Sequence, residues 1–188
     1  MQIPQELTES VLRGDPGAFE ELVRSTHRAV YSLVYRVVGN HEDAADVTQE
    51  VYVRVWRNLK SFRGDANMAT WLYRVAANAS LTFVKRRARG GIPVQPDELP
   101  ELPSPDGADQ RADADALQNA LATLTPAARA VVVLKDVYGW TCEEIAKEMD
   151  TTEGAVKVRL FRARHRLADE LASAGVVVKM NPRKKASS

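Results

Sequence analysis

Apolar residues recur every three or four positions along most of this chain, which is the spacing of amphipathic helices. The clearest stretches are Phe19–Val37, Val47–Leu59, Leu72–Phe83, Leu117–Leu124, Ile145–Met149 and Val156–Leu167, and a continuous aliphatic run spans Val131–Leu134. Strand-like alternation with a period of two persists nowhere. The pattern therefore predicts an all-α protein. Val47, Val51, Tyr52, Val55, Trp56 and Leu59 are expected to form a buried stripe, and Leu117, Leu121 and Leu124 to line a helix of the second half.

Helix ends are marked by capping residues. Asp15 precedes Pro16, a pair typical of a helix start, and Gly39-Asn40 predicts the end of that helix and the cap of the next. A further helix is expected from Thr70 to Arg87. In the second half, starts are expected at Thr125-Pro126, at the capping box Thr141–Glu144 and at Thr152.

A break in composition divides the chain. Residues 90–110 hold five prolines, three glycines and no basic residue, which disfavours regular structure. We therefore expect two small helical domains joined by a flexible acidic linker. The expected boundaries are 1–89 for the first domain, 90–112 for the linker, 113–174 for the second domain and 175–188 for a basic tail.

The net charge of +1 conceals an alternation of charge along the chain. Residues 51–89 hold nine basic residues and one acidic, and residues 154–188 hold nine basic and two acidic. The intervening 90–153 hold four basic and thirteen acidic residues. Two basic blocks indicate two surfaces for a polyanion such as nucleic acid, or else two solvated helix faces.

Composition also narrows the function classes. The single Cys142 excludes an internal disulfide, and three scattered histidines offer no zinc ligand set. Phosphate-binding loops, nucleophile elbows and HExxH are all missing from the sequence, so we expect no enzyme, no metal and no cofactor. Apolar runs as short as Val131–Leu134 predict no transmembrane helix, and a cytoplasmic protein without membrane contact is the default.

The last two predicted helices resemble a helix-turn-helix, whose second helix enters the DNA major groove. If Val156 and Leu160 are buried, the opposite face carries Gly154, Lys157, Val158, Phe161 and His165. Lys157 is then placed to bind guanine, and Val158 or Phe161 a thymine methyl. Arg159 flanks this face, while Arg162 and Arg164 suit phosphates. The alternative is that these basic residues only complement a helix dipole.

The predicted helix Thr70–Arg87 carries Trp71, Arg74, Asn78 and Lys85 opposite its apolar face and ends in a run that includes Arg86 and Arg87. An aromatic ring, a guanidinium and an amide on one face suit unstacked bases, and the terminal cluster suits phosphates. The alternative is that Trp71 is core and the cluster a solvated helix end.

An acidic stripe is expected on the exposed side of the preceding helix. Asp43, Asp46 and Glu50 share this stripe, with Gln49 beside it. Such acids either stabilise the helix N-terminus or meet a basic protein partner, and spacing alone favours the first.

Three segments together resemble the extracytoplasmic-function group of bacterial sigma factors in the sigma-seventy family. Asp43–Trp56 is similar to its region 2.1–2.2, Phe62–Asn78 to its promoter-melting segment and Leu124–Leu167 to its region 4. The resemblance covers most of the chain, and both modules occur in the family's order around a short acidic linker.

The resemblance implies specific partners. Asp43, Asp46, Gln49 and Glu50 would bind the clamp helices of core RNA polymerase, and the second module would rest on the polymerase flap. Promoter DNA would be bound at two elements, and an anti-sigma factor is an expected further partner. The free chain is expected to bind promoter DNA only weakly, because polymerase must fix its position.

The resemblance also implies roles for the DNA-binding residues. Phe62, Arg63 and Asn67 would hold a base flipped from the minus-ten element. Trp71, Arg74 and Asn78 would support melting, with Lys85, Arg86 and Arg87 on phosphates. The minus-thirty-five duplex would be read by Gly154, Lys157, Val158, Arg159, Phe161, Arg162 and Arg164. Two other hypotheses are a conventional helix-turn-helix regulator and an enzyme that acts on nucleic acid. The first would not need a surface for single-stranded DNA, and the second would need a catalytic arrangement that this sequence lacks.

Overall fold

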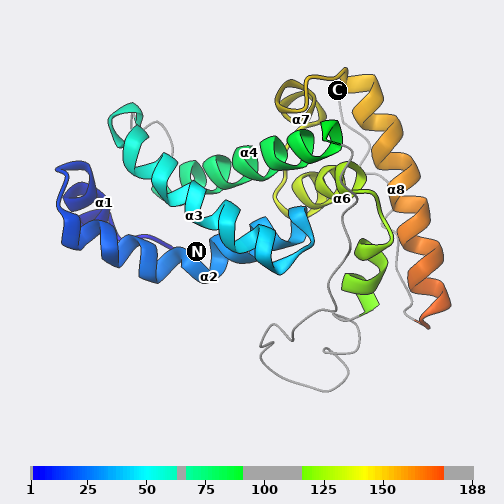
Figure 1. Ribbon diagram of the computed structural model, residues 1–188, viewed down its shortest axis with the longest axis horizontal. Coiled ribbons are helices and arrows are strands. Elements are labelled where there is room, and N and C mark those ends of the chain that lie inside the picture. The colour runs from blue at the N-terminus through cyan, green and yellow to red at the C-terminus, as the bar shows by residue number, and fades with distance from the viewer. Residues whose placement is uncertain (1, 63–66, 91–115, 176–188) are drawn as a thin grey trace, which may run out of the picture.

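The computed structural model describes residues 2–62, 67–90 and 116–175, which form only helices and turns (Figure 1). The expected all-α class is confirmed. The elements are α1 (Gln5–Leu12), α2 (Pro16–Val38), α3 (His41–Asn58), the 3-10 turn η1 (Leu59–Ser61), α4 (Met68–Arg89), a helical segment at 116–122, α6 (Pro126–Val132), the π-helical η2 (Val133–Val137), α7 (Cys142–Glu148) and α8 (Glu153–Ser173). Arg63 and most of the expected linker and tail lie outside the described residues.

The first four helices form the N-terminal module. α2, α3 and α4 pack pairwise against one another, and α1 packs against α2. Its centre is aliphatic, since Leu22, Leu33, Val51 and Leu72 have no exposed surface. Each such side chain contributes about 1.5–3 kcal/mol relative to an exposed one, so burial of this apolar centre is a major stabilising term for the module.

The expected helix ends of this module are present. Asp15 accepts hydrogen bonds from the backbone N–H groups of Gly17 and Ala18, at 2.8 and 3.3 Å. Gly39 ends α2 with a φ of +80°, a conformation that glycine adopts without a Cβ clash. Asn40 then caps α3 by accepting from the N–H of Asp43 at 2.9 Å. Each cap satisfies a backbone group that would otherwise lack a partner.

Replacing Asp15 by alanine is expected to lower the free energy of unfolding by about 1 kcal/mol, because two amide groups at the start of α2 lose their acceptor. Asp15→Asn keeps a cap and should stay close to wild type. Urea denaturation followed by circular dichroism measures both. Equal stability of the alanine variant and wild type would show that water replaces the cap without cost.

The C-terminal module contains the helix-turn-helix formed by α7 and α8, which pack on each other. Thr141 and Glu144 form the expected capping box at the start of α7, with Thr141 N–H donating to Glu144 Oε2 at 2.8 Å. Asp150 makes the turn with a φ of +48°, and Thr152 caps α8. Val156, Leu160, Ala163 and Leu167 of α8 are buried, as their spacing predicts.

Several local features differ from the sequence-based expectation. Helix α1 was not predicted from the sequence. It buries Thr8 and Val11 and packs against α2. Trp56 is 45% exposed, so assigning it to the buried stripe of α3 was wrong. Trp56 lies outside the bundle and meets Phe19 edge-on, with ring centroids 4.8 Å apart.

The two modules pack against each other as well as internally. Figure 1 shows α6 between the ends of α2 and α4 on one side and α8 on the other, and α6 contacts all three. One hydrophobic cluster includes buried residues of both modules, such as Val38 and Val131. Across the residues that the structure describes, no helix combines the length and apolarity needed to span a membrane.

Candidate nucleic-acid interface

The outer face of α8 is open to solvent, as its pattern predicts. Gly154, Lys157 and His165 are exposed. The apolar side chains of Val158 and Phe161 are 50% and 60% exposed, although Leu160 of the same helix is buried. Exposed apolar groups between basic ones suit the mixed chemistry of base edges in a major groove.

Basic side chains of α8 differ in their partners. Lys157 lies 2.8 Å from Glu153, whose hydrogen bond raises the pKa of the Lys157 ammonium group. Arg164 donates from Nε to Asp136 at 3.0 Å, and this hydrogen bond raises the pKa of its guanidinium. Arg164 is thus tied to η2 in this conformation, whereas Arg162 is exposed on the adjoining turn.

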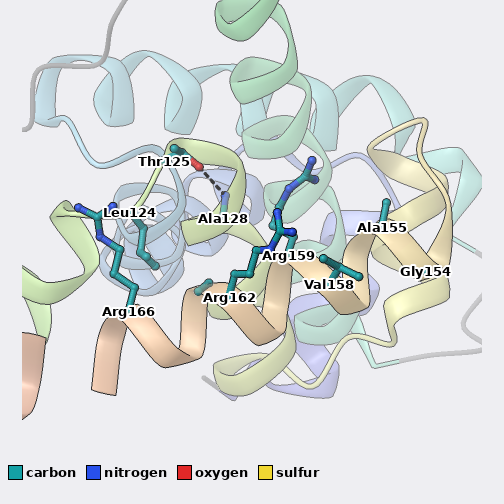
Figure 2. Close-up of a pocket in the computed structure, with 10 residues that line it drawn as sticks. Leu124, Thr125, Ala128, Gly154, Ala155, Val158, Arg159, Arg162 and Arg166 are labelled. Atoms are coloured by element: carbon teal, nitrogen blue, oxygen red, sulfur yellow. Dashed lines mark hydrogen bonds between the residues drawn. The ribbon is translucent and has the colours of Figure 1, made fainter. Parts of the chain in front are cut away.

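An open groove of about 590 Å³ lies between α8 and the start of α6 (Figure 2). Leu124, Ala128 and Ala163 give it apolar walls. Arg159, Arg162 and Arg166 line it from α8, and Figure 2 shows them along one side of that helix. Three guanidinium groups beside an apolar wall make this side of α8 attractive to an anionic ligand.

The expected single-strand face of α4 is only partly exposed. Trp71 is half-buried and meets Phe62 edge-on, with ring centroids 5.5 Å apart. Asn67 caps α4 by accepting from the N–H of Ala69 at 2.7 Å. Asn78 is half-buried, and its Oδ1 is a buried acceptor for which no hydrogen bond is formed. The prediction that this face lies opposite the core does not hold for Trp71, which packs against the hydrophobic core, as the alternative interpretation allowed.

Acidic groups of the second module contact that face, although the Arg74 side chain remains 62% exposed. Arg74 donates to Glu144 at 3.1 Å, and Lys85 donates to Asp150 at 2.6 Å. The Lys85 hydrogen bond lowers the pKa of the Asp150 carboxyl group. The pKa of Glu144 is also lowered, first by the backbone N–H of Thr141 and further by Arg74.

The basic end of α4 is partly folded inward. Arg87 forms an ion pair with Asp43, and the two side chains are only 22% and 20% exposed. Arg86 and Arg87 both lie over the Phe83 ring, at 5.5 and 5.8 Å from its centroid. The expectation that Asp43 belongs to an exposed stripe is therefore wrong, because α4 supplies a cation that packs over it.

The rest of the acidic stripe on α3 is at the surface. Asp46 and Gln49 are exposed. Glu50 accepts from Arg54 Nε at 3.1 Å, one helical turn further on. Asp46 and Gln49 are therefore accessible at the surface of α3, whereas Glu50 is paired with Arg54.

Sequence reasoning missed the contacts that join the modules. Arg129 is only 4% exposed, and its Nη2 donates to the backbone carbonyl of Val38 at 2.7 Å. Arg36 donates to the hydroxyl of Tyr138 at 3.3 Å, and burial raises the pKa of Tyr138. A lone arginine in an apolar stretch, Ala127–Leu134, was the one available signal.

Two family models match the chain in the order of its modules. The sigma-70 region 2 model matches residues 22–90, and the sigma-70 region 4 model matches residues 114–167. The first range covers α2 to α4, and the second ends within α8. The chain thus contains the two regions of a sigma-70-type factor, in the order of its two modules.

Related proteins indicate which group of sigma-70 factors this chain belongs to. The ECF RNA polymerase sigma factor SigE of Mycolicibacterium smegmatis is 38% identical, covering 85% of this chain and 65% of that protein. SigM of Mycobacterium tuberculosis is 37% identical, covering 87% of this chain and 82% of its own length. The sigma-H factor of Pseudomonas aeruginosa is 33% identical, covering 85% and 89%. This chain belongs to the ECF family of RNA polymerase sigma factors.

Solved structures share the fold. The sigma factor RpoE of Bartonella quintana, solved in complex with the anti-sigma factor NepR, matches with a TM-score of 0.60 and 23% identity over 82% of this chain and 96% of its own. CnrH, solved in complex with the cytosolic domain of CnrY, matches with a TM-score of 0.52 and 24% identity over 89% and 96%.

Proposed function

We propose that this chain binds core RNA polymerase and directs initiation at specific promoters. α8 reads the minus-thirty-five duplex, chiefly through Lys157, Val158 and Phe161, with Arg159 and Arg162 beside them. Trp71, Arg74 and Asn78 of α4 capture the melted minus-ten strand. The observation that supports this proposal most is that one chain carries both the exposed face of α8 and the Trp71, Arg74 and Asn78 face of α4, within the two regions that define the family.

The chain contributes binding energy and no bond chemistry of its own in this proposal. Stacking offsets the lost pairing of melted bases by about 1–3 kcal/mol per base. The polymerase supplies catalysis and holds both modules in register with the promoter. Asp46, Gln49 and Glu50 of α3 provide the acidic surface for its clamp, and the second module meets its flap.

A protein inhibitor is a further proposed partner. The RpoE of similar fold is described in complex with an anti-sigma factor, and CnrH in complex with the cytosolic domain of CnrY. An inhibitor of this kind acting here would have to block Asp46 and Glu50, or one of the two DNA surfaces.

Replacing Asp46 and Glu50 together by alanine is expected to weaken binding to core RNA polymerase about tenfold, since both charges face a basic partner surface. Co-elution and fluorescence anisotropy with purified bacterial core enzyme measure the change. Glu20→Ala/Glu21→Ala removes two exposed acids of α2 and serves as the control. If both double variants bind equally, the clamp contact lies elsewhere.

A further inference from the structure

His165 lies on the outer face of α8, and the proposed function gives it no role. Gly154, Val158, Phe161 and His165 follow one another at helical spacing, so they form one stripe along the helix. All four residues are exposed. The His165 ring lies against that of Phe161, with ring centroids 4.2 Å apart and planes inclined at 40°. The stripe that is proposed to read base edges therefore ends in an imidazole.

The length of this stripe indicates what its last member meets. His165 comes 11 positions after Gly154, which is a rise of about 16 Å along a helix. The major groove of DNA is about 12 Å wide. A recognition helix places its N-terminal residues against base edges, so the end of the stripe reaches the border of the groove. Phosphates form that border, and an imidazole at this point would lie beside them.

Permanent cations flank the stripe on both sides. Arg162 and Arg166 line the groove towards α6. On the other flank, Arg164 donates to Asp136 of η2 at 3.0 Å. Arginine keeps its charge at every pH at which a protein is folded, so these cations oppose a further positive charge on His165 in the free chain. The phosphates of a bound duplex would offset that repulsion and favour an imidazolium.

The other charged groups around His165 are carboxylates and further bases. Asp169 lies one turn further along α8 and is exposed. Such groups ordinarily keep their charge between about pH 6 and pH 8, whereas an imidazole changes its charge within that range. His165 is also the one histidine after His41 in the sequence. The charged side chains of the two helices that pack on α8 are Arg129 of α6 and Glu143, Glu144, Lys147 and Glu148 of α7.

We infer that His165 is a proton-dependent phosphate contact of the duplex-binding surface: it binds a backbone phosphate as an imidazolium and takes up a proton from solvent when it does so. This inference rests on the proposed function of α8. A ligand that favours the protonated form binds more tightly as the pH falls, so duplex binding should strengthen below neutral pH. The Phe161 ring supports the same state, since an aromatic face attracts a cation.

The test compares a permanently neutral and a permanently charged side chain at position 165. The full chain is titrated with a mixed-sequence DNA duplex of about 20 base pairs at low ionic strength, and fluorescence anisotropy gives the affinity at about pH 6 and about pH 8. Wild type should bind about three- to tenfold more tightly at the lower pH. His165→Gln should lose this gain, and His165→Arg should bind tightly at both pH values.

A second histidine provides a matched control. His27 of α2 is also exposed and also lies beside an aromatic ring, that of Tyr31, with centroids 6.1 Å apart. His27→Gln should keep the pH dependence of wild type, and circular dichroism at both pH values should show that every variant is folded. Full pH dependence in His165→Gln, or an equal loss of it in the two glutamine variants, would overturn the inference.

The polymerase assay is independent of these measurements. If wild type binds core RNA polymerase and the duplex, but His165→Gln keeps the pH dependence of wild type, the proton-dependent contact is wrong and the sigma role stands. If the chain binds neither core enzyme nor duplex at either pH, the proposed function fails, and the inference that rests on it fails with it.

Discussion

Replacing Lys157 and Arg162 by alanine is expected to reduce promoter-specific transcription about a hundredfold while leaving polymerase binding intact. Lys157 lies on the open face of α8, where its ammonium group can reach base acceptors once Glu153 releases it. A good base contact contributes about 1–3 kcal/mol of discrimination. Arg162 is placed for a phosphate, whose loss lowers affinity for every sequence.

The single variants should fail in different ways. Lys157→Ala should relax sequence preference at one position of the upstream element, whereas Arg162→Ala should weaken binding uniformly and lower the salt slope by about 1. Run-off transcription and salt-dependent promoter binding by the assembled holoenzyme measure both effects. Arg24→Ala/Lys60→Ala removes two exposed basic residues of the N-terminal module as a control. A double variant with wild-type transcription would exclude α8 as the reader.

Replacing Trp71 by alanine is expected to lower the yield of open promoter complexes about thirtyfold, because a ring that stacks on an unpaired base contributes about 1–3 kcal/mol. Trp71 stands on α4 one turn from Arg74, and its half-buried ring is held against Phe62. That contact orients the indole while part of it stays accessible. Potassium permanganate footprinting of melted thymines follows the open complex directly.

Because Trp71 also packs against the bundle, its variants need a structural control. Trp71→Phe keeps an aromatic surface and should lose only about threefold. Thermal unfolding must show that both variants are folded at the assay temperature. Holoenzyme binding to closed duplex should be unchanged, since α8 is untouched. Wild-type open complexes with folded Trp71→Ala would mean that this ring has a purely structural role.

Much of the fold could be predicted because local signals decide it. Asp15-Pro16, Gly39-Asn40 and the Thr141–Glu144 box each fix a helix end through contacts within four residues. The exposed face of α8 follows from periodicity alone, since Val156 and Leu160 point inward and Lys157 does not. Side chains whose environment is their own helix are the ones that the sequence describes well.

The remaining features depend on contacts between distant segments. Asp43 looks exposed from its own helix, but Arg87, 44 positions later, covers it. Arg74 and Lys85 look unpaired from their own helix, but they bind carboxylates 70 and 65 positions later in the chain. The sequence pattern of α4 carries no information about where α7 packs. The candidate residues could therefore be predicted from the sequence, but their contacts with distant segments could not.

The most direct test of the central claim is promoter-specific initiation by purified core RNA polymerase with and without this chain. Fragmented genomic DNA from the source organism serves as template, and the 5′ ends of the transcripts are sequenced. The account predicts that the chain binds the core enzyme stoichiometrically and produces start sites that share two upstream elements. No binding and no new start sites, together with specific duplex binding by the chain alone, would contradict it.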